Sequence, residues 1–193
     1  MTVVHPQTLE LAPVGDPKSL FATFAQFPSG VAALSALVDG EVGPEPVVLV
    51  ASSFQVGISA DPPLVLFAVQ HTSTSWPRLR TALQRPGALL GVSVLGEAHD
   101  AAARQLASKA LAAADRFAGI ATTTTASGAH FVHGAPIWLE CSIHSQVRAG
   151  DHDVVLLQVH TAASAPGTEP LVWHSSAFRT LTPRTAAGEE AQG

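Results

Sequence analysis

Hydrophobic residues in the first half of the chain occur in short runs separated by turn residues. Apolar runs at Val31–Val38, Val47–Ala51 and Pro63–Val69 are separated by segments that contain Gly, Pro and Asp. Short apolar runs bounded in this way predict β-strands. An Asp39-Gly40 turn joins the first two runs, as in tight antiparallel hairpins. The pattern therefore indicates a meander of antiparallel strands.

The second half continues this strand pattern. From Ile137 to Val147, apolar residues at odd positions through Ile143 alternate with mostly polar ones, as expected of a half-buried strand. The turn Arg148–Asp151 then predicts a hairpin with a strand at His152–Ala163. Shorter strands are expected at Ala88–Leu95, Leu171–Trp173 and Phe178–Leu181.

Three segments have helical character. Leu20, Phe21, Phe24 and Phe27 recur at helical spacing after Asp16-Pro17, and Pro28–Gly30 ends that segment. Residues 75–85 predict a helix with Ser75 as its N-cap, and the Ala-rich residues 97–118 predict another that ends before Gly119. The polar residues 122–136 are expected to form a loop. Many short strands with inserted helices predict a mainly β fold, a closed or nearly closed β-barrel.

Composition is consistent with one domain. The chain has 193 residues, of which 47% are hydrophobic and 13% charged, and its mean hydropathy is +0.28. We expect a single domain at residues 18–182 with tails at 1–17 and 183–193, and part of the apolar surface buried in a homodimer. The net charge of −5 argues against nucleic acid as a partner. Short apolar runs and the absence of a signal-like start predict no membrane segment and a cytoplasmic protein.

Several kinds of chemistry are disfavoured by residue type. There is one cysteine, Cys141, and no tyrosine, and neither a G-x-G-x-x-G motif nor a P-loop occurs. Cys141 lies in the alternating strand and is interpreted as a small buried hydrophobe. Nine histidines leave a metal-dependent hydrolase as an alternative, with candidates in the last third at His130, His133, His144, His152 and His160. No HExxH motif occurs and His130 and His133 fall in the expected loop, so we predict no metal site.

Hydroxyl residues gather at two predicted element boundaries. Ser52 and Ser53 follow a strand, and Ser73, Thr74 and Ser75 lead into a helix. A helix N-terminus presents free N–H groups and a partial positive charge, so hydroxyls there can form a phosphate site. Ordinary turn and capping chemistry would explain the same residues. Ser108-Lys109, a hydroxyl beside an ammonium, is a third possible contributor.

Several segments, in order, resemble the flavin reductase family of FMN-binding split barrels, over about residues 18–182. The segments that carry the resemblance are Phe24–Val31, Ala51–Val65, His71–Trp76, Gly91–Leu95, Asp115–Gly119, Trp138–Cys141 and Gly150–His152. The resemblance implies a homodimeric split β-barrel that binds FMN, or FAD, without covalent attachment.

The resemblance also implies roles for individual residues. The residues that would line the flavin ring and ribityl chain are Ala51, Ser52, Ser53, Phe54, Val56 and Gly57. Those that would bind the phosphate are Ser73, Thr74, Ser75, Ser108 and Lys109, with Trp76 and Phe117 as pocket walls. The residues of the nicotinamide region would be His152, the catalytic candidate, and Val172, Trp173, His174 and Ser175.

The implied activity is transfer of a hydride from NADH or NADPH to a flavin. The reduced flavin would diffuse to a separate monooxygenase. Hydride transfer needs two stacked rings and excluded water, and the cofactor supplies the reactive group. The alternative within the same fold is a flavin-binding protein with another flavin-dependent role and little reductase activity.

Overall fold

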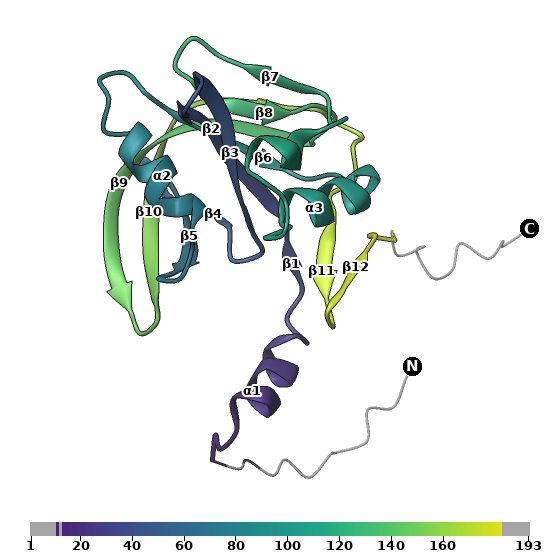
Figure 1. Cartoon of the computed structure of the whole chain (residues 1–193). Coiled ribbons are helices and arrows are strands. Elements are labelled where there is room, and N and C mark those ends of the chain that lie inside the picture. The colour runs from purple at the N-terminus through teal and green to yellow at the C-terminus, as the bar shows by residue number, and fades with distance from the viewer. Residues whose placement is uncertain (1–10, 12, 183–193) are drawn as a thin grey trace, which may run out of the picture.

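A mainly antiparallel β architecture with a few short helices is seen in the computed structural model, which describes residues 11 and 13–182 (Figure 1). The expected tail at 183–193 and most of the N-terminal tail lie outside the described residues. The helices are α1 (Pro17–Phe24), α2 (Ser75–Ala82), η1 (Glu97–His99), α3 (Asp100–Leu106) and η2 (Ala114–Phe117). The strands are β1 (Ser29–Gly30), β2 (Ala32–Asp39), β3 (Pro44–Ala51), β4 (Gln55–Ala60), β5 (Pro63–Gln70), β6 (Leu90–Val94), β7 (Thr122–Thr124), β8 (His130–Val132), β9 (Ile137–Ala149), β10 (His152–Ser164), β11 (Val172–His174) and β12 (Ala177–Arg179).

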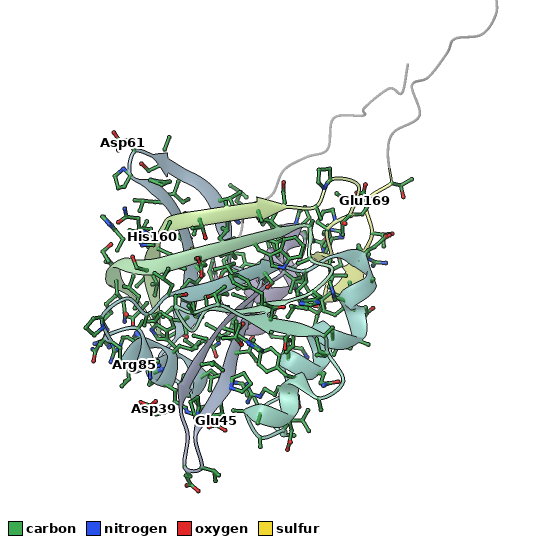
Figure 2. The ribbon with its side chains drawn as sticks, turned by 90° about the horizontal axis from the view of Figure 1, so that it is seen from above. Asp39, Glu45, Asp61, Arg85, His160 and Glu169 are labelled. Carbon is green, nitrogen blue, oxygen red and sulfur yellow. The ribbon has the colours of Figure 1, made fainter. Side chains whose placement is uncertain are left out.

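The main sheet has seven strands in the order β3-β2-β6-β9-β10-β5-β4. All its pairings are antiparallel, but the order is not a simple meander, because β6, β9 and β10 separate the two hairpins β2–β3 and β4–β5. The hairpin β9–β10 is the longest in the fold and pairs over its whole length. Figure 2 shows Asp61 at the turn of β4–β5, and Asp39 and Glu45 near the end of β2–β3.

Hydrophobic residues cover both faces of β2, which explains its near-continuous apolar sequence. Ala32 and Leu34 point into the main core with Phe67 and Leu157, all of them buried. Ala33 faces a second cluster that includes residues of α3, η2 and the segment before β11. Because β2 is buried on both faces, it anchors the sheet to the helical side of the molecule.

The expected strands are confirmed with small shifts at their ends, while three expectations about other segments are wrong. The helix expected at 97–118 breaks after Leu106, and η2 folds back onto α3, where Gln105 Nε2 donates to the carbonyl oxygens of Arg116 (3.1 Å) and Ala118 (2.8 Å). The segment 122–136, expected as a loop, contains the ribbon β7–β8. The segment expected as a turn after β3 contains β4.

Helix α1 forms as expected, but its apolar residues do not meet the core. Asp16 caps it by accepting from the backbone N–H groups of Lys18 (3.0 Å) and Ser19 (3.1 Å). No residue of α1 is buried, and Phe21 and Phe24 are 68% and 60% exposed. Figure 1 shows α1 standing away from the barrel. None of the helices in the described part of the chain is long and apolar enough to cross a membrane.

Candidate functional site

A cavity of about 350 Å³ opens where β3 ends, beside the N-terminus of α2 and the segment that follows α3. Its apolar lining comes from β3 and β5, and includes Leu49, Val50, Ala68 and Val69. Its polar lining comes from three separate stretches of sequence together with His152. Its size suits a small-molecule ligand, since such pockets have volumes of about 300–1,000 Å³.

The turn after β3 contributes Ala51, Ser52 and Ser53 to the cavity, as expected. Ser53 Oγ donates to the Ala68 carbonyl oxygen and accepts from the Ala68 N–H, both at 3.0 Å. These bonds fasten the turn to β5 and hold Ser52, which is exposed, at the mouth. The other ring-lining candidates are not among the lining residues: Phe54 is buried in the core, Val56 is 58% exposed on β4, and Gly57 has a φ of +72°.

Ser73, Thr74 and Ser75 all line the cavity at the start of α2. The N-cap is Thr74, not Ser75 as expected, and the Thr74 side chain forms no capping hydrogen bond. Ser73 Oγ instead accepts from the backbone N–H of Trp76 at 3.1 Å. The start of α2 therefore presents a row of hydroxyls and helix N–H groups to the cavity, the arrangement that favours an anion.

Two cations lie beside this helix start. Lys109 lines the cavity as expected, whereas its neighbour Ser108 is not among the lining residues. Arg116 also lines it, and Arg116 Nη1 lies 3.3 Å from Ser75 Oγ. Neither cation forms an ion pair with a carboxylate in the described ranges. Arg116 was not among the predicted site residues, although it lies in the segment Asp115–Gly119 that carries part of the family resemblance.

The structure places Trp76 and Phe117 in the core and not on the wall of this cavity. The Trp76 ring packs edge-on against Phe67, with ring centroids 5.1 Å apart. Phe117 packs edge-on against His130 at 4.7 Å. Each residue follows a polar lining residue in sequence but packs into a core cluster, so Trp76 anchors α2 and Phe117 anchors η2.

His152 reaches the cavity from the start of β10. Its Nδ1 lies 2.7 Å from Asp151 Oδ1. This hydrogen bond, followed by the charge of a protonated His152, lowers the pKa of the Asp151 carboxyl. A neighbouring pair places His71 Nε2 at 3.2 Å from Asp153 Oδ1. The carboxylate of Asp151 therefore orients the His152 ring at the mouth of the cavity.

The remaining nicotinamide candidates belong to a small separate sheet, β1-β11-β12. Trp173 packs against Phe178 with ring centroids 5.0 Å apart. Ser175 has a φ of 50° in the turn to β12, and its N–H donates to the Ala25 carbonyl oxygen at 2.7 Å. Val172, Trp173, His174 and Ser175 are not among the cavity-lining residues, so the structure does not bring them together with His152 around this cavity.

His130 and Cys141, two of the residues considered for other chemistry, both lie in β-strands. His130 lies in β8, not in a loop as expected, and its Nδ1 is 2.7 Å from Thr124 Oγ1. The described ranges contain no group of three or more His, Cys, Asp or Glu side chains placed to hold a metal ion. Cys141 is buried, as expected, and burial raises the pKa of its thiol to about 12.

The chain matches a family model and several known proteins. The family described as "Flavin reductase like domain" matches residues 24–182. The chain is 33% identical over 184 residues to an NADH-dependent FAD reductase of Streptomyces globisporus, covering 94% of this chain and 95% of that protein. It is 34% identical over 169 residues to the actinorhodin polyketide dimerase of Streptomyces coelicolor, covering 88% and 89%.

Two further similarities bear on the fold and on partners. The reductase subunit HsaB of a flavin-dependent monooxygenase from Rhodococcus jostii is 30% identical over 168 residues, covering 87% of this chain and 80% of that one. The structure of the Streptomyces globisporus NADH:FAD oxidoreductase SgcE6 in complex with NAD and FAD fragments superposes with a TM-score of 0.75 at 35% identity, covering 89% and 98%. The expected fold class, mainly β with inserted helices, is confirmed. The chain therefore belongs to the flavin reductase like domain family.

Proposed function

We propose that the protein is a flavin reductase, which transfers a hydride from NADH or NADPH to FMN or FAD. The observation that carries this proposal is the cavity itself. It joins an apolar wall, a hydroxyl-lined helix N-terminus, two cations that form no ion pair within the described ranges, and a histidine. Binding groups converge there, while no cysteine and no carboxylate lie among its lining residues. Such a site holds a cofactor in position and leaves the reactive chemistry to it.

The start of α2 fits the phosphate end of a flavin nucleotide. Ser73, Thr74 and Ser75 supply hydroxyls and N–H groups, and Lys109 and Arg116 supply positive charge. Arg116 Nη1 donates to Ser75 Oγ and its Nε donates to the Leu111 carbonyl oxygen at 3.4 Å, which leaves the Nη2 N–H groups available to a phosphate oxygen. Charge-assisted hydrogen bonds of this kind are about twice as strong as neutral ones.

The strand side of the cavity fits the ring system. Apolar side chains of β3 and β5, with Ala51 and Ser52 at the end of β3, form a wall that excludes water. A bound flavin would supply the hydride acceptor there. The part of the protein is to hold the ring against this wall with one face open to the nicotinamide.

His152 stands at the cavity mouth and is proposed to contact the nicotinamide nucleotide. Its orientation by Asp151 supports a fixed hydrogen-bonding direction. Residues 172–175 would assist only if a nucleotide spans from the cavity to the small sheet. Such a span is supported by the second hydrophobic cluster, which includes Ala33 and Phe117. Val50, which lines the cavity, and Trp173, in the small sheet, both pack against this cluster.

The test is a steady-state assay of NADH and NADPH oxidation with and without added FMN, FAD or riboflavin. The proposal predicts flavin-dependent oxidation with saturation in both substrates. If protein that is free of bound flavin oxidises NADH or NADPH at the same rate with and without added flavin, the reductase activity is excluded.

A second candidate function is a flavin-dependent role other than supplying free reduced flavin. It is favoured by the similarity to the relative named as a polyketide dimerase. This alternative predicts flavin that co-purifies and survives gel filtration, with negligible turnover of added flavin. Rapid turnover with weakly bound flavin favours the reductase.

Two kinds of partner belong to this proposal. The similarity to a monooxygenase reductase subunit supports a separate monooxygenase that receives the reduced flavin. A homodimer is supported by the exposed Phe21 and Phe24 on α1 and by Val56 and Ile58 on the edge strand β4. Light scattering that gives the mass of one chain would contradict the dimer. Cell fractionation tests the predicted cytoplasmic location.

A further inference from the structure

A second cavity, of about 320 Å³, lies on the outside of the barrel between the ribbon β7–β8 and the hairpin β9–β10. Its aromatic and charged lining comes from Phe131, His133, Trp138 and Glu140, and His133 Nε2 is hydrogen-bonded to Thr123 Oγ1. It shares no lining residue with the cavity at the start of α2 that is proposed to bind flavin, called the flavin cavity below. Nothing in the proposed reductase function requires it.

Strand alternation explains why these side chains face outward. Leu139 and Cys141 of β9 are buried in the main core, so Trp138 and Glu140 point to the other face of the sheet. Thr161 of β10 is paired with Glu140 across the hairpin. Its neighbour His160 falls at an irregularity of this pairing, and Figure 2 labels it on β10.

Three hydroxyls hold the carboxylate of Glu140 in one orientation. Oε1 accepts from Thr125 Oγ1 at 2.7 Å and from Ser127 Oγ at 2.9 Å, and Oε2 accepts from Thr161 Oγ1 at 2.8 Å. The hydrogen bond from Thr125 is the first cause of a lowered pKa, which burial only partly offsets. The group is therefore a fixed negative charge at neutral pH. Within the described ranges it forms no ion pair.

Aromatic side chains border the same cavity. The Trp138 indole N–H donates to the Val132 carbonyl oxygen at 2.7 Å, which fixes the plane of the ring. Phe131 lies on the neighbouring ribbon strand, and Ala162 and Ala163 leave the β10 side open. A carboxylate beside fixed aromatic rings is suited to a cation with an apolar body, because the charge meets both the carboxylate and the ring faces.

We propose that this cavity binds a small organic cation, an arylamidinium or arylammonium, by pairing its charge with Glu140 and its ring with Trp138. The competing explanation is that the hydroxyls around Glu140 only fasten the loop 125–127 to the sheet. The hydroxyl partners, together with the charge of His160, stabilise the ionised form of Glu140, as the lowered pKa of its carboxyl indicates, and within the described ranges no Lys or Arg is paired with it. A cationic ligand would therefore meet a carboxylate that is already ionised and oriented.

Calorimetric titration of the full-length protein with benzamidinium and with benzamide tests the proposal. The two probes have nearly the same shape and differ in charge. We expect benzamidinium to bind about tenfold more tightly, a preference lost in Glu140→Gln and kept in Glu97→Gln, an exposed carboxylate outside the cavity. Equal binding of the two probes, or a preference that persists in Glu140→Gln, would overturn it.

A second variant keeps the test decisive if Glu140→Gln does not fold. Trp138→Leu keeps the carboxylate and removes the ring, and it should weaken benzamidinium binding about fivefold. Unchanged affinity in Trp138→Leu would also contradict the proposal. Competition between benzamidinium and FMN would place the cation in the flavin cavity and overturn the assignment, whereas additive binding supports two sites.

Discussion

The guanidinium of Arg116 lies 3.3 Å from the hydroxyl of Ser75, from Nη1 to Oγ, and so joins η2 to the first turn of α2. The two residues are 41 positions apart in sequence. The contact brings a positive charge to a helix end that already favours anions. It identifies Arg116 as a phosphate-binding candidate beside Lys109.

Replacement of Arg116 by Met should raise the KM for FMN about tenfold, because one charge-assisted hydrogen bond contributes about 1.5–3 kcal/mol. The KM for riboflavin, which has no phosphate, should stay within about twofold. Steady-state kinetics with both flavins measures the difference. The matched control is Arg80→Met, since Arg80 is an exposed arginine on α2. An equal loss with riboflavin would show that Arg116 has a structural role instead.

His152→Gln should lower kcat/KM for the nicotinamide substrate about tenfold while leaving the affinity for flavin unchanged. The reason is that His152 lines the cavity from the start of β10, on a different element from the hydroxyls and cations proposed to bind the phosphate. Asp151→Asn should give a smaller loss of the same kind, because it weakens the orientation of the His152 ring. Stopped-flow reduction and fluorescence titration of flavin separate the two effects. His144→Gln, an exposed histidine of β9, serves as control, and a loss of flavin affinity in His152→Gln would contradict the assignment.

Protonation of His130 should destabilise the fold below neutral pH. Burial lowers the pKa of this imidazole from its ordinary value of 6.5, and its Nε2 is buried without a hydrogen-bond partner in the described structure. His130 therefore binds a proton more readily in the unfolded chain than in the folded chain. The free energy of unfolding should therefore fall as the pH drops below about 6.5, with a slope approaching 1.4 kcal/mol per pH unit for one such group.

Urea unfolding at about pH 7.5 and about pH 5.5 measures this dependence. His130→Gln should show a weaker dependence than the unaltered protein, since it removes the titrating group but keeps a hydrogen-bonding side chain. His144→Gln should keep the full dependence, because His144 is exposed. The same pH dependence in all three proteins would exclude His130 as the cause.

Gly91→Ala should reduce the free energy of unfolding by about 2–3 kcal/mol, the usual cost of forcing extra volume into a packed core. A Cβ at Gly91 would lie 2.5 Å from the carbonyl oxygen and 2.8 Å from the amide nitrogen of His130, both backbone atoms. Thermal or urea unfolding checks the value. Gly30→Ala is the control, because a Cβ there would meet nothing within 4 Å. Equal stability of the two variants would show that β8 can shift away from β6.

The sheet strands were predictable because their signal is local. Alternation in β9 and apolar runs in β2, β3 and β5 reflect faces that each strand must bury. Strands β1, β4, β7 and β8 were not predicted. Ser, Gly and Pro around β4 resemble turn chemistry, and the threonines of β7 were interpreted as a polar loop although β-branched residues favour strands. The helix expected at 97–118 is interrupted after Leu106. Two hydrogen bonds from the Gln105 side chain hold η2 folded back against α3.

Most of the polar candidate residues line one cavity, whereas Ser108 and the aromatic candidates do not. Ser52, Ser53, Ser73, Thr74, Ser75, Lys109 and His152 all line one cavity. Trp76 and Phe117 belong to the core instead, since adjacent residues on a short helix point in different directions. No local pattern distinguishes an aromatic residue that walls a pocket from one that anchors a helix behind it.

The sequence by itself determined the strand-rich class, the row of hydroxyl residues at the start of α2 and the resemblance that led to the family. Hydrophobic period, capping residues and short motifs are properties of neighbouring positions, so one chain can reveal them. Only the tertiary structure decided that Arg116 meets Ser75, that Glu140 is held by hydroxyls from two other segments and that α1 remains exposed. These relationships depend on which distant segments pack together, and packing is a property of the whole fold.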